Sequence, residues 1–267
     1  MTEAELAQDL LRLARQAATA AAELVVAGRS EVIAKKAGVS TKTSATDPVT
    51  EMDKAAEKLI VSLIKAQRPN DGFIGEEGSS DPGSSGIAWA IDPIDGTVNY
   101  MYGLPVWTIS VAALQDGDAI AGCLVAPDLN KVYFGTKGGG GFEESPSGVR
   151  QLQVLPSDDL ARCLLATGFA YRKERREEIA PVIAQVLPQV RDLRRMGAAS
   201  IDIVSVATGG VDAYVESGVR IWDYAAALLI ATEAGAEFIH RNQPWGEWLL
   251  VCRPGLTEKL EAITNQL

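Results

Sequence analysis

The order of hydrophobic segments changes once along this chain, near residue 150, and this change limits the folds open to it. Before that point, two helical patterns are followed by short strand patterns separated only by turns, which is typical of an antiparallel sheet. After it, apolar strand patterns alternate with helical patterns, as in α/β proteins. The chain of 267 residues is therefore predicted to contain an antiparallel half at 1–146 and an α/β half at 147–267.

Periodicity and turn residues predict the individual elements. The segment 2–27 reads as a long amphipathic helix that Gly28 ends, and the polar segment 39–50 reads as a loop. A second helix is expected to follow, with Asp47 near its cap and Pro48 in its first turn. Further helical patterns lie at 174–187, 198–208, 223–234 and 256–265. Turn residues predict loops or hairpins at 78–86, 115–118 and 135–142.

Composition narrows the classes of partner. The net charge of −10 argues against nucleic-acid binding, which needs a basic face. No run reaches the roughly 18 apolar residues of a membrane span, so no membrane partner is expected. The first residues are acidic and lack the basic region and apolar block of a signal peptide. We therefore expect a cytoplasmic protein.

The few cysteines and the single histidine limit the kinds of metal site and catalytic group that the chain can form. Cys123, Cys163 and Cys252 are far apart and lack CxxC spacing, so they indicate neither a disulfide framework nor a thiolate metal site. The single histidine, His240, rules out paired-histidine metal centres and argues against a histidine-based triad. Chemistry in this chain is expected to use carboxylates, hydroxyls and metal ions.

Acids recur at the ends of predicted strands and the starts of predicted helices. The stretches are TDPVTEMD (46–53), FIGEEG (73–78), WAIDPIDGT (89–97) and WDYAAALLIATEAGA (222–236). Taken singly, each has an ordinary structural explanation. The pair Glu76 and Glu77 suits a solvated turn, and Asp223 stands where a helix N-cap belongs.

WAIDPIDGT is the most informative of these stretches. Pro93 is expected to turn the chain at a strand end, so that Asp92, Asp95 and the Ile94 carbonyl can point the same way. Such hard oxygen ligands suit Mg²⁺. Thr97 then opens a candidate helix, and N–H groups at a helix start attract phosphate. A plain Asx turn explains the same residues equally well.

Together, these stretches resemble the inositol monophosphatase family. WAIDPIDGT is similar to the family's first signature, and WDYAAALLIATEAGA is similar to its second. GEEG and DPVTEMD fall at the expected places and in the expected order. RRMGAASID (194–202) and DAYVESGVRIWD (212–223) also resemble the pattern, most closely that of bacterial members. The resemblance covers about residues 5–260 and implies a layered αβαβα sandwich.

The resemblance implies a set of metal ligands. Glu76, Asp92 and the Ile94 carbonyl would hold one Mg²⁺ ion. Asp92, Asp95 and Asp223 would hold a second, and Glu76 would assist a weaker third. Several carboxylates around a phosphate dianion would repel it, whereas the same acids carrying two or three divalent ions would attract it.

The resemblance also implies a reaction. In the family a metal-activated water attacks phosphorus directly, without a phospho-enzyme, and a Thr–Asp pair assists it. That pair corresponds here to Thr97 and Asp53, with Glu76 as a further catalytic residue. Without the resemblance, Thr97 would read as a helix cap and Asp53 as an acid in the first turns of a helix.

Substrate contacts are implied in the same way. The corresponding residues are Asp95, Gly96, Thr97, Gly197, Ala198, Ala199, Glu216 and Asp223. Backbone N–H groups at 96–97 would bind phosphate, and Glu216 would accept hydrogen bonds from the hydroxyls of a polyol. Many bacterial members read Gly-Ser-Ala at 197–199, so one possible hydroxyl contact is missing here. No role is assigned to Arg220, to Lys42 or to the basic cluster at 171–176.

The function implied is a Mg²⁺-dependent phosphomonoesterase acting on myo-inositol 1-phosphate. The alternatives within the superfamily are histidinol phosphate, fructose 1,6-bisphosphate or a 3′-phosphoadenosine nucleotide as substrate. A bisphosphate would call for basic residues, which 171–176 could supply. A non-catalytic regulatory relative is the alternative of another class. The resemblance further implies a homodimer and inhibition by Li⁺.

Overall fold

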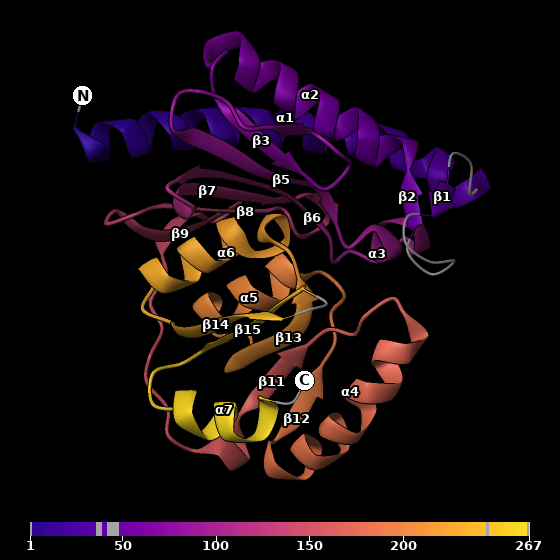
Figure 1. The fold of residues 1–267 in the computed structure, drawn as a ribbon, viewed down its shortest axis with the longest axis vertical. Coiled ribbons are helices and arrows are strands. Elements are labelled where there is room, and N and C mark those ends of the chain that lie inside the picture. The colour runs from indigo at the N-terminus through magenta and orange to yellow at the C-terminus, as the bar shows by residue number, and fades with distance from the viewer. Residues whose placement is uncertain (1, 36–38, 42–47, 244–245, 266) are drawn as a thin grey trace.

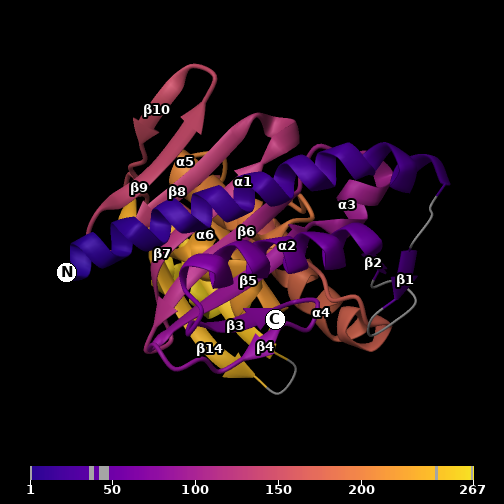
Figure 2. The ribbon, with the colours of Figure 1, turned by 90° about the horizontal axis from the view of Figure 1, so that it is seen from above.

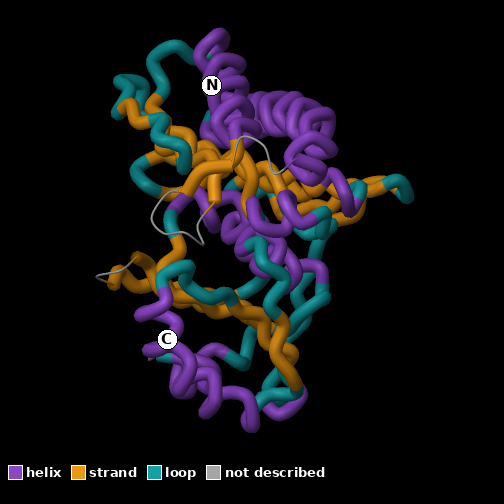
Figure 3. Tube along the Cα trace, turned by 90° about the vertical axis from the view of Figure 1, so that its right-hand side faces the viewer, coloured by secondary structure: helices purple, strands orange, loops and turns teal. Residues whose placement is uncertain are grey.

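The computed structural model describes every residue except 1, 36–38, 42–47, 244–245 and 266. Helices and sheets alternate in layers, and Figure 3 shows helices between the two large sheets and outside them. In order, the layers in Figure 1 are α1 (Glu3–Lys35) with α2 (Glu51–Gln67), an eight-stranded sheet, α5 (Ala199–Thr208) with α6 (Ile221–Glu233), a five-stranded sheet, and α4 (Lys173–Val186) with α7 (Thr257–Thr264). The predicted αβαβα sandwich is confirmed.

The eight-stranded sheet is antiparallel except where β3 and β5 run parallel. Its strands, in spatial order, are β10 (Gly148–Gln151), β9 (Gly140–Ser145), β8 (Lys131–Thr136), β7 (Asp118–Ala126), β6 (Thr108–Gln115), β5 (Ile87–Asp95), β3 (Gly72–Gly75) and β4 (Ser80–Asp81). The loops predicted at 115–118 and 135–142 are tight hairpin connections. The first uses Asp116 and Gly117, both with positive φ, which suits a two-residue hairpin turn.

The five-stranded sheet is mixed. Its strands, in spatial order, are β12 (Asp192–Arg194), β11 (Leu164–Thr167), β13 (Ala213–Val219), β15 (Gly246–Cys252) and β14 (Glu237–Gln243). Strand β11 pairs in parallel with β12 and β13, whereas β15 pairs antiparallel with β13 and β14. Short 3₁₀ helices lie at η1 (Pro127–Leu129), η2 (Leu160–Arg162) and η3 (Leu187–Gln189). The three cysteines are buried and free. The division into halves at residue 146 stays a prediction.

The first helix does not end at Gly28, contrary to the prediction. Helix α1 continues to Lys35, and Figure 2 shows it running lengthwise over the first sheet. At Gly28 a Cβ atom would collide with the Met52 side chain of α2. The glycine therefore leaves room for the Met52 side chain where the two helices meet, and its small size rather than its flexibility matches its position.

The segment around residue 48 was also predicted wrongly. Residues 39–41 and 48–50 form a two-stranded sheet, β1 (Val39–Thr41) with β2 (Pro48–Thr50), where a loop and a helix start were expected. Helix α2 begins at Glu51, and Thr50 is its N-cap. Strand formation agrees with the preference of β-branched Val and Thr for extended backbone. Asp47 and Lys42 lie outside the described residues.

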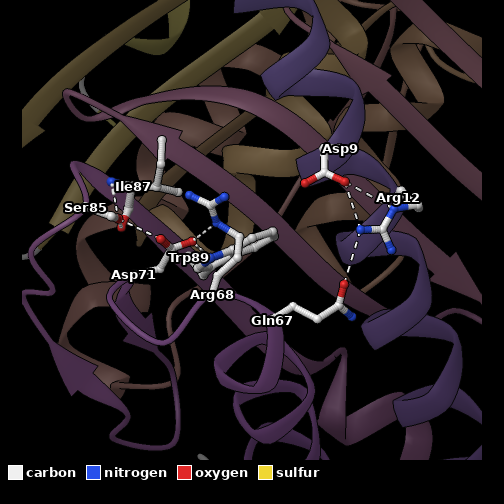
Figure 4. A network of polar contacts seen from close by, with 8 residues as sticks. All are labelled: Asp9, Arg12, Gln67, Arg68, Asp71, Ser85, Ile87 and Trp89. Atoms are coloured by element: carbon white, nitrogen blue, oxygen red, sulfur yellow. Dashed lines mark hydrogen bonds and ion pairs between the residues drawn. The ribbon is translucent and has the colours of Figure 1, made fainter. Parts of the chain in front are cut away.

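A buried and fully paired acid fixes α2 to the sheet (Figure 4). Asp71, which is 2% exposed, accepts hydrogen bonds from Trp89 Nε1 at 2.9 Å and Ser85 Oγ at 2.6 Å. The Arg68 guanidinium at the end of α2 forms an ion pair with the same carboxylate. Because Trp89 lies on β5 and is the first residue of WAIDPIDGT, this network fixes the strand that carries the motif.

Glycines also set the distance between α6 and the first sheet. A Cβ at Gly122, on β7, would lie 2.9 Å from Ala226 Cα and 3.2 Å from the Ala226 carbonyl oxygen. At Gly141, on β9, it would collide with the Ile230 carbonyl oxygen. Both obstacles are backbone atoms of α6, so a side chain could be accommodated only by moving the whole helix.

We expect Gly122→Ala to lower the free energy of unfolding by about 1–3 kcal/mol, because it overpacks this contact. Urea titration of the variant and the wild type measures the change. Gly210→Ala is the matched control, since a Cβ there makes only ordinary contacts, the nearest at 3.5 Å. Equal stability of Gly122→Ala and the wild type would contradict the close contact between α6 and the sheet.

Candidate functional site

Three separate segments bring acids to the end of β5. Glu76 directly follows β3, and its backbone N–H donates to the Ile91 carbonyl at 3.1 Å. Asp92 and Asp95 lie on β5, and Asp223 lies in the first turn of α6, in the layer beneath the sheet. These are the acids that the sequence analysis proposed as metal ligands, and they interact electrostatically with one another.

The bend between Asp92 and Asp95 has a different cause from the one predicted. Pro93 does not end the strand, because β5 continues to Asp95 with a register shift against β6 between the two acids. Proline cannot donate a ladder hydrogen bond and is tolerated at such bulges. The Ile94 N–H donates to Asp92 Oδ1 at 3.0 Å, which closes an Asx turn within the bulge.

Burial and like charge act together on Asp92. The side chain is 2% exposed, and burial is the largest cause that raises its pKa well above the usual range. The negative charges of Glu76, Asp95 and Asp223 raise the pKa further. The site therefore destabilises its own ionised carboxylates unless a positive charge joins them.

Asp95 is held by the start of helix α5. Its Oδ1 accepts the Ala199 N–H at 3.2 Å, and its Oδ2 accepts the Ser200 N–H at 2.8 Å and the Ser200 hydroxyl. Burial raises the pKa of Asp95 to about 6, and the Ser200 hydrogen bonds oppose that rise. The helix thus receives its cap from a strand of the other sheet.

Asp223 was expected at the N-cap of the helix. It is instead the third residue of α6. Helix α6 begins at Ile221, and Asp223 Oδ2 accepts the Arg220 backbone N–H at 2.6 Å. Burial and the negative charge of Glu76 raise the pKa of Asp223 well above its usual range. Arg220 is exposed and stands at the N-cap position.

Thr97 and Asp53 lie together, although they are distant in the sequence. The Thr97 hydroxyl lies 3.2 Å from Asp53 Oδ1 and 3.0 Å from the Ile94 carbonyl oxygen. Asp53 is fully buried, and its Oδ2 accepts the Thr50 N–H at 2.8 Å and the Thr50 hydroxyl at 2.5 Å. The N-cap of α2 therefore fixes the carboxylate that Thr97 contacts.

Gly96 brings the two halves of the chain together at the site. Its φ of 90° favours glycine, and a Cβ there would lie 3.1 Å from Ala198 Cβ and 3.2 Å from the Gly197 carbonyl oxygen. It precedes the short helix α3 (Thr97–Tyr102). From α3, Asn99 Nδ2 donates to the Met196 carbonyl at 2.8 Å, which holds the 196–198 segment beside the helix.

Glu216 belongs to β13, in the C-terminal part of the chain, and lies beside this cluster. The Tyr214 hydroxyl donates to its Oε2 at 3.0 Å, and burial raises the pKa of Glu216 to about 7. A Cβ at Gly168 would collide with the Glu216 carboxylate, so only glycine leaves room for it there. From the basic cluster at 171–176, Arg175 reaches Ser217 Oγ at 3.2 Å.

Two further polar residues at the site were missed. Ser200 binds Asp95, as described above. Asp202 is 1% exposed, and burial together with the charges of Glu216 and Asp95 raises its pKa to about 8. Its Oδ1 has no hydrogen-bond partner among the described residues. In the sequence Asp202 looks like an ordinary acid in a first helical turn, and nothing signals its neighbours.

The donor set fits a hard divalent cation in its chemistry. All of the acids offer oxygen atoms, they are largely buried, and they repel one another. Across the described ranges, no group of three or more His, Cys, Asp or Glu side chains is placed so that it could hold a metal ion. Asp92, Asp95 and Asp223 each accept backbone N–H groups in this structure.

A cavity of about 350 Å³ lies elsewhere, along α6. Tyr224, Phe238 and His240 are among its lining residues, whereas Glu76, Asp92, Asp95 and Asp223 are not. His240 and the Tyr224 hydroxyl both contact Glu247 there. The cavity therefore does not belong to the carboxylate cluster.

Comparison with known proteins identifies the family of this chain. The model of the inositol monophosphatase family matches residues 6–266. An inositol-1-monophosphatase of Mycobacterium leprae is 40% identical, and the match covers 96% of this chain and 93% of that protein. A Nus factor SuhB of Xylella fastidiosa is 36% identical over 72% of this chain and 68% of its own length.

A solved structure shares the fold as well. Mycobacterium tuberculosis SuhB superposes with a TM-score of 0.83 at 36% identity, covering 97% of this chain and 96% of that one. The chain therefore belongs to the inositol monophosphatase family, whose members are phosphatases that act on phosphorylated small molecules. In the part of the chain that the structure describes, no helix is long and apolar enough to cross a membrane.

The raised pKa values predict how stability depends on pH. In the unfolded chain an Asp has a pKa near 3.8 and a Glu near 4.5, whereas folding raises the pKa to about 6 for Asp95 and about 7 for Glu216. Between these values the folded state holds protons that the unfolded state has lost, so stability falls as pH rises from about 4 to about 8. Each pKa unit contributes about 1.4 kcal/mol.

Calorimetric unfolding in EDTA at pH 5 and pH 8 measures this effect. We expect the lower midpoint at pH 8, and a smaller difference for Asp95→Asn because that variant removes one of the buried charges. Stability that rose between pH 5 and pH 8 in EDTA would contradict the electrostatics described here.

Proposed function

We propose that this chain is a Mg²⁺-dependent phosphomonoesterase that hydrolyses myo-inositol 1-phosphate to inositol and phosphate. One observation carries the proposal: Glu76, Asp92, Asp95 and Asp223, from three separate segments, meet at the end of β5, where the negative charges of Glu76 and Asp95 raise the pKa of both Asp92 and Asp223. Such mutual repulsion is unfavourable for a purely structural cluster, whereas divalent cations would relieve it. Membership of the family and the name of the M. leprae relative support this choice.

The residues that would hold Mg²⁺ are Glu76, Asp92, Asp95, Asp223 and the Ile94 carbonyl, for two to three ions. When bound, these ions would supply positive charge opposite the phosphate and acidify a nearby water. Inhibition by Li⁺ would follow from competition for one of these positions.

Thr97 and Asp53 would take up the proton of the attacking water. The Thr97 hydroxyl has one hydrogen, which it can donate either to Asp53 Oδ1 or to the Ile94 carbonyl. When Thr97 donates to Asp53, its oxygen can accept a proton from water. The water oxygen then bonds to phosphorus, the bond from phosphorus to the alcohol oxygen breaks, and the water proton passes through Thr97 to Asp53. The departing alcohol oxygen takes a proton from solvent water, and Asp53 returns its proton to solvent, which restores the carboxylate.

The organic part of the substrate would lie towards β13. Glu216 would accept hydrogen bonds from adjacent hydroxyls, while backbone N–H groups at Gly96 and Thr97 would contact the phosphate. The backbone at 197–199 would contribute further contacts. At Ala199 the N–H now donates to Asp95, so a substrate hydroxyl would have to share or displace that bond.

Two other functions have support of their own. A substrate with a second phosphate, such as fructose 1,6-bisphosphate, would need a basic residue, and Arg175 of the cluster at 171–176 reaches Ser217, the residue after Glu216 on β13. The relatives named Nus factor SuhB favour a regulatory role, with or without catalysis. A homodimer and a cytoplasmic location stay predictions from the sequence.

A panel of phosphomonoesters tests the substrate. Initial rates with Mg²⁺ would be compared for myo-inositol 1-phosphate, histidinol phosphate, fructose 1,6-bisphosphate and a 3′-phosphoadenosine nucleotide. We expect the highest kcat/KM for the inositol phosphate. Equal values for all four would rule out the inositol assignment, and no hydrolysis of any would favour the regulatory relative.

Asp95→Asn tests the role of the acids in catalysis. The substitution keeps the shape of the side chain but removes its charge, and we expect kcat/KM to fall by more than about 100-fold while the fold is retained. Asp118→Asn is the control, because that acid is exposed in the β6–β7 turn. Unchanged turnover in Asp95→Asn would refute the role of Asp95 in metal binding.

Gly168→Ala tests the polyol side of the site. The added methyl group would displace the Glu216 carboxylate. We expect KM for myo-inositol 1-phosphate to rise about 10-fold, the value of one lost hydrogen bond, with little change for p-nitrophenyl phosphate, which has no adjacent hydroxyls. A parallel loss on both substrates would show that Gly168 does not act through polyol recognition.

A further inference from the structure

The hydroxyl groups of Thr108, on β6, and Ser200, on α5, form a hydrogen-bonded chain that ends at Asp95. The Ser200 hydroxyl lies against Asp95 Oδ2, and Thr108 Oγ1 lies 2.7 Å from Ser200 Oγ. Thr108 and Ser200 are fully buried, and Asp95 is 8% exposed. Thr108 is on β6, directly opposite Asp95 in the ladder, whereas Ser200 belongs to the C-terminal half.

The chemistry of the three groups fixes the direction of this chain. An ionised carboxylate only accepts hydrogen bonds, so the single Ser200 proton is donated to Asp95. Ser200 Oγ can then only accept from Thr108, and Thr108 is the donor of that bond. The hydrogen bonds therefore run from Thr108 to Ser200 to Asp95.

The same bonds determine which Asp95 oxygen remains available. A carboxylate has about four acceptor positions, two on each oxygen. Ser200 fills both positions on Oδ2, through its N–H and its hydroxyl, while the Ala199 N–H fills one position on Oδ1. One acceptor position is left, and it is on Oδ1.

Capping of α5 does not require the Ser200 hydroxyl. The N-cap residue Ala198 has no side-chain cap, and the two N–H groups of Ala199 and Ser200 are already satisfied by Asp95. The hydroxyl adds a third bond to the same carboxylate. Ala198 has no hydroxyl, and the hydroxyl of Ser200, two residues later, is the one that reaches Asp95.

We propose that Ser200, held by Thr108, is a positioning residue that occupies Oδ2 of Asp95 and leaves Oδ1 to bind the metal ion. This inference rests on the proposed function. Hydrogen-bonded partners of metal-ligating carboxylates orient them and commonly contribute 10–100-fold to metal affinity. Without the hydroxyl, Oδ2 regains a free acceptor position, and the carboxylate can rotate away from the orientation that presents Oδ1.

Titration calorimetry of the metal-free protein with Mg²⁺ tests the proposal without relying on turnover. We expect Ser200→Ala to bind Mg²⁺ about 10–100-fold more weakly than the wild type. Ser205→Ala is the matched control, because it makes the same change on the same helix and should leave the affinity unchanged. Ser200 affects the affinity for Mg²⁺ through Asp95. At saturating Mg²⁺, kcat of Ser200→Ala should therefore approach the wild-type value.

Thr108 provides an independent variant if Ser200→Ala does not fold. Thr108→Val removes the donor to Ser200 but keeps every direct bond to Asp95, so we expect a smaller loss of Mg²⁺ affinity. Thr108→Ser restores the hydroxyl and should restore the affinity. A merely structural role of Ser200 would lower the unfolding temperature without changing Mg²⁺ affinity.

The outcomes separate this proposal from the function on which it rests. Mg²⁺ binding by the wild type with equal affinity in Ser200→Ala and Thr108→Val would overturn the role of Ser200 and leave the proposed function intact. Absence of Mg²⁺ binding by the wild type would overturn both. Weaker binding in Ser200→Ala and Thr108→Val, with recovery in Thr108→Ser, would support the proposal.

Discussion

Repulsion between buried carboxylates is the constraint on which the rest of this structure depends. Elsewhere in the molecule a buried acid is neutralised: Asp71 has the Arg68 guanidinium and the Trp89 indole N–H beside it. At the end of β5 the neighbours of Asp92 are other acids, and each influence on its pKa raises it. Holding these negative charges together lowers the stability of the fold. A bound cation or another positively charged ligand would remove this repulsion.

Backbone N–H groups at helix starts make this arrangement tolerable. The first turn of α5 donates two N–H groups to Asp95, and the residue before α6 donates one to Asp223. The positive ends of these helix dipoles add to the effect. Both helices lie between the two sheets (Figure 1), so the acids of the first sheet meet helices that belong to the C-terminal half. The site therefore requires both halves, and neither sheet could build it alone.

Small residues allow these parts to approach closely enough. Gly122 permits α6 to lie against β7, Gly96 permits the 197–198 segment to lie against α3, and Gly168 leaves space for Glu216. In each case a methyl group would meet backbone atoms or a carboxylate. The geometry of the site is thus determined by close packing between layers, while the acids themselves come from short local motifs.

The sequence by itself determined the succession of helix and strand patterns, the hairpins and the acids of WAIDPIDGT, because periodicity, turn residues and short motifs are local properties of the chain. The layered sandwich was expected only from the resemblance of these motifs to those of a known family. Two predictions from the sequence were wrong: Gly28 does not end its helix, and Pro93 does not end its strand. Only the tertiary structure decided those points, since Gly28 is needed by Met52 of another helix and Pro93 sits in a bulge that β6 accommodates. The contact of Ser200 with Asp95 joins residues 105 positions apart, and no local pattern records which distant side chain a hydroxyl will meet.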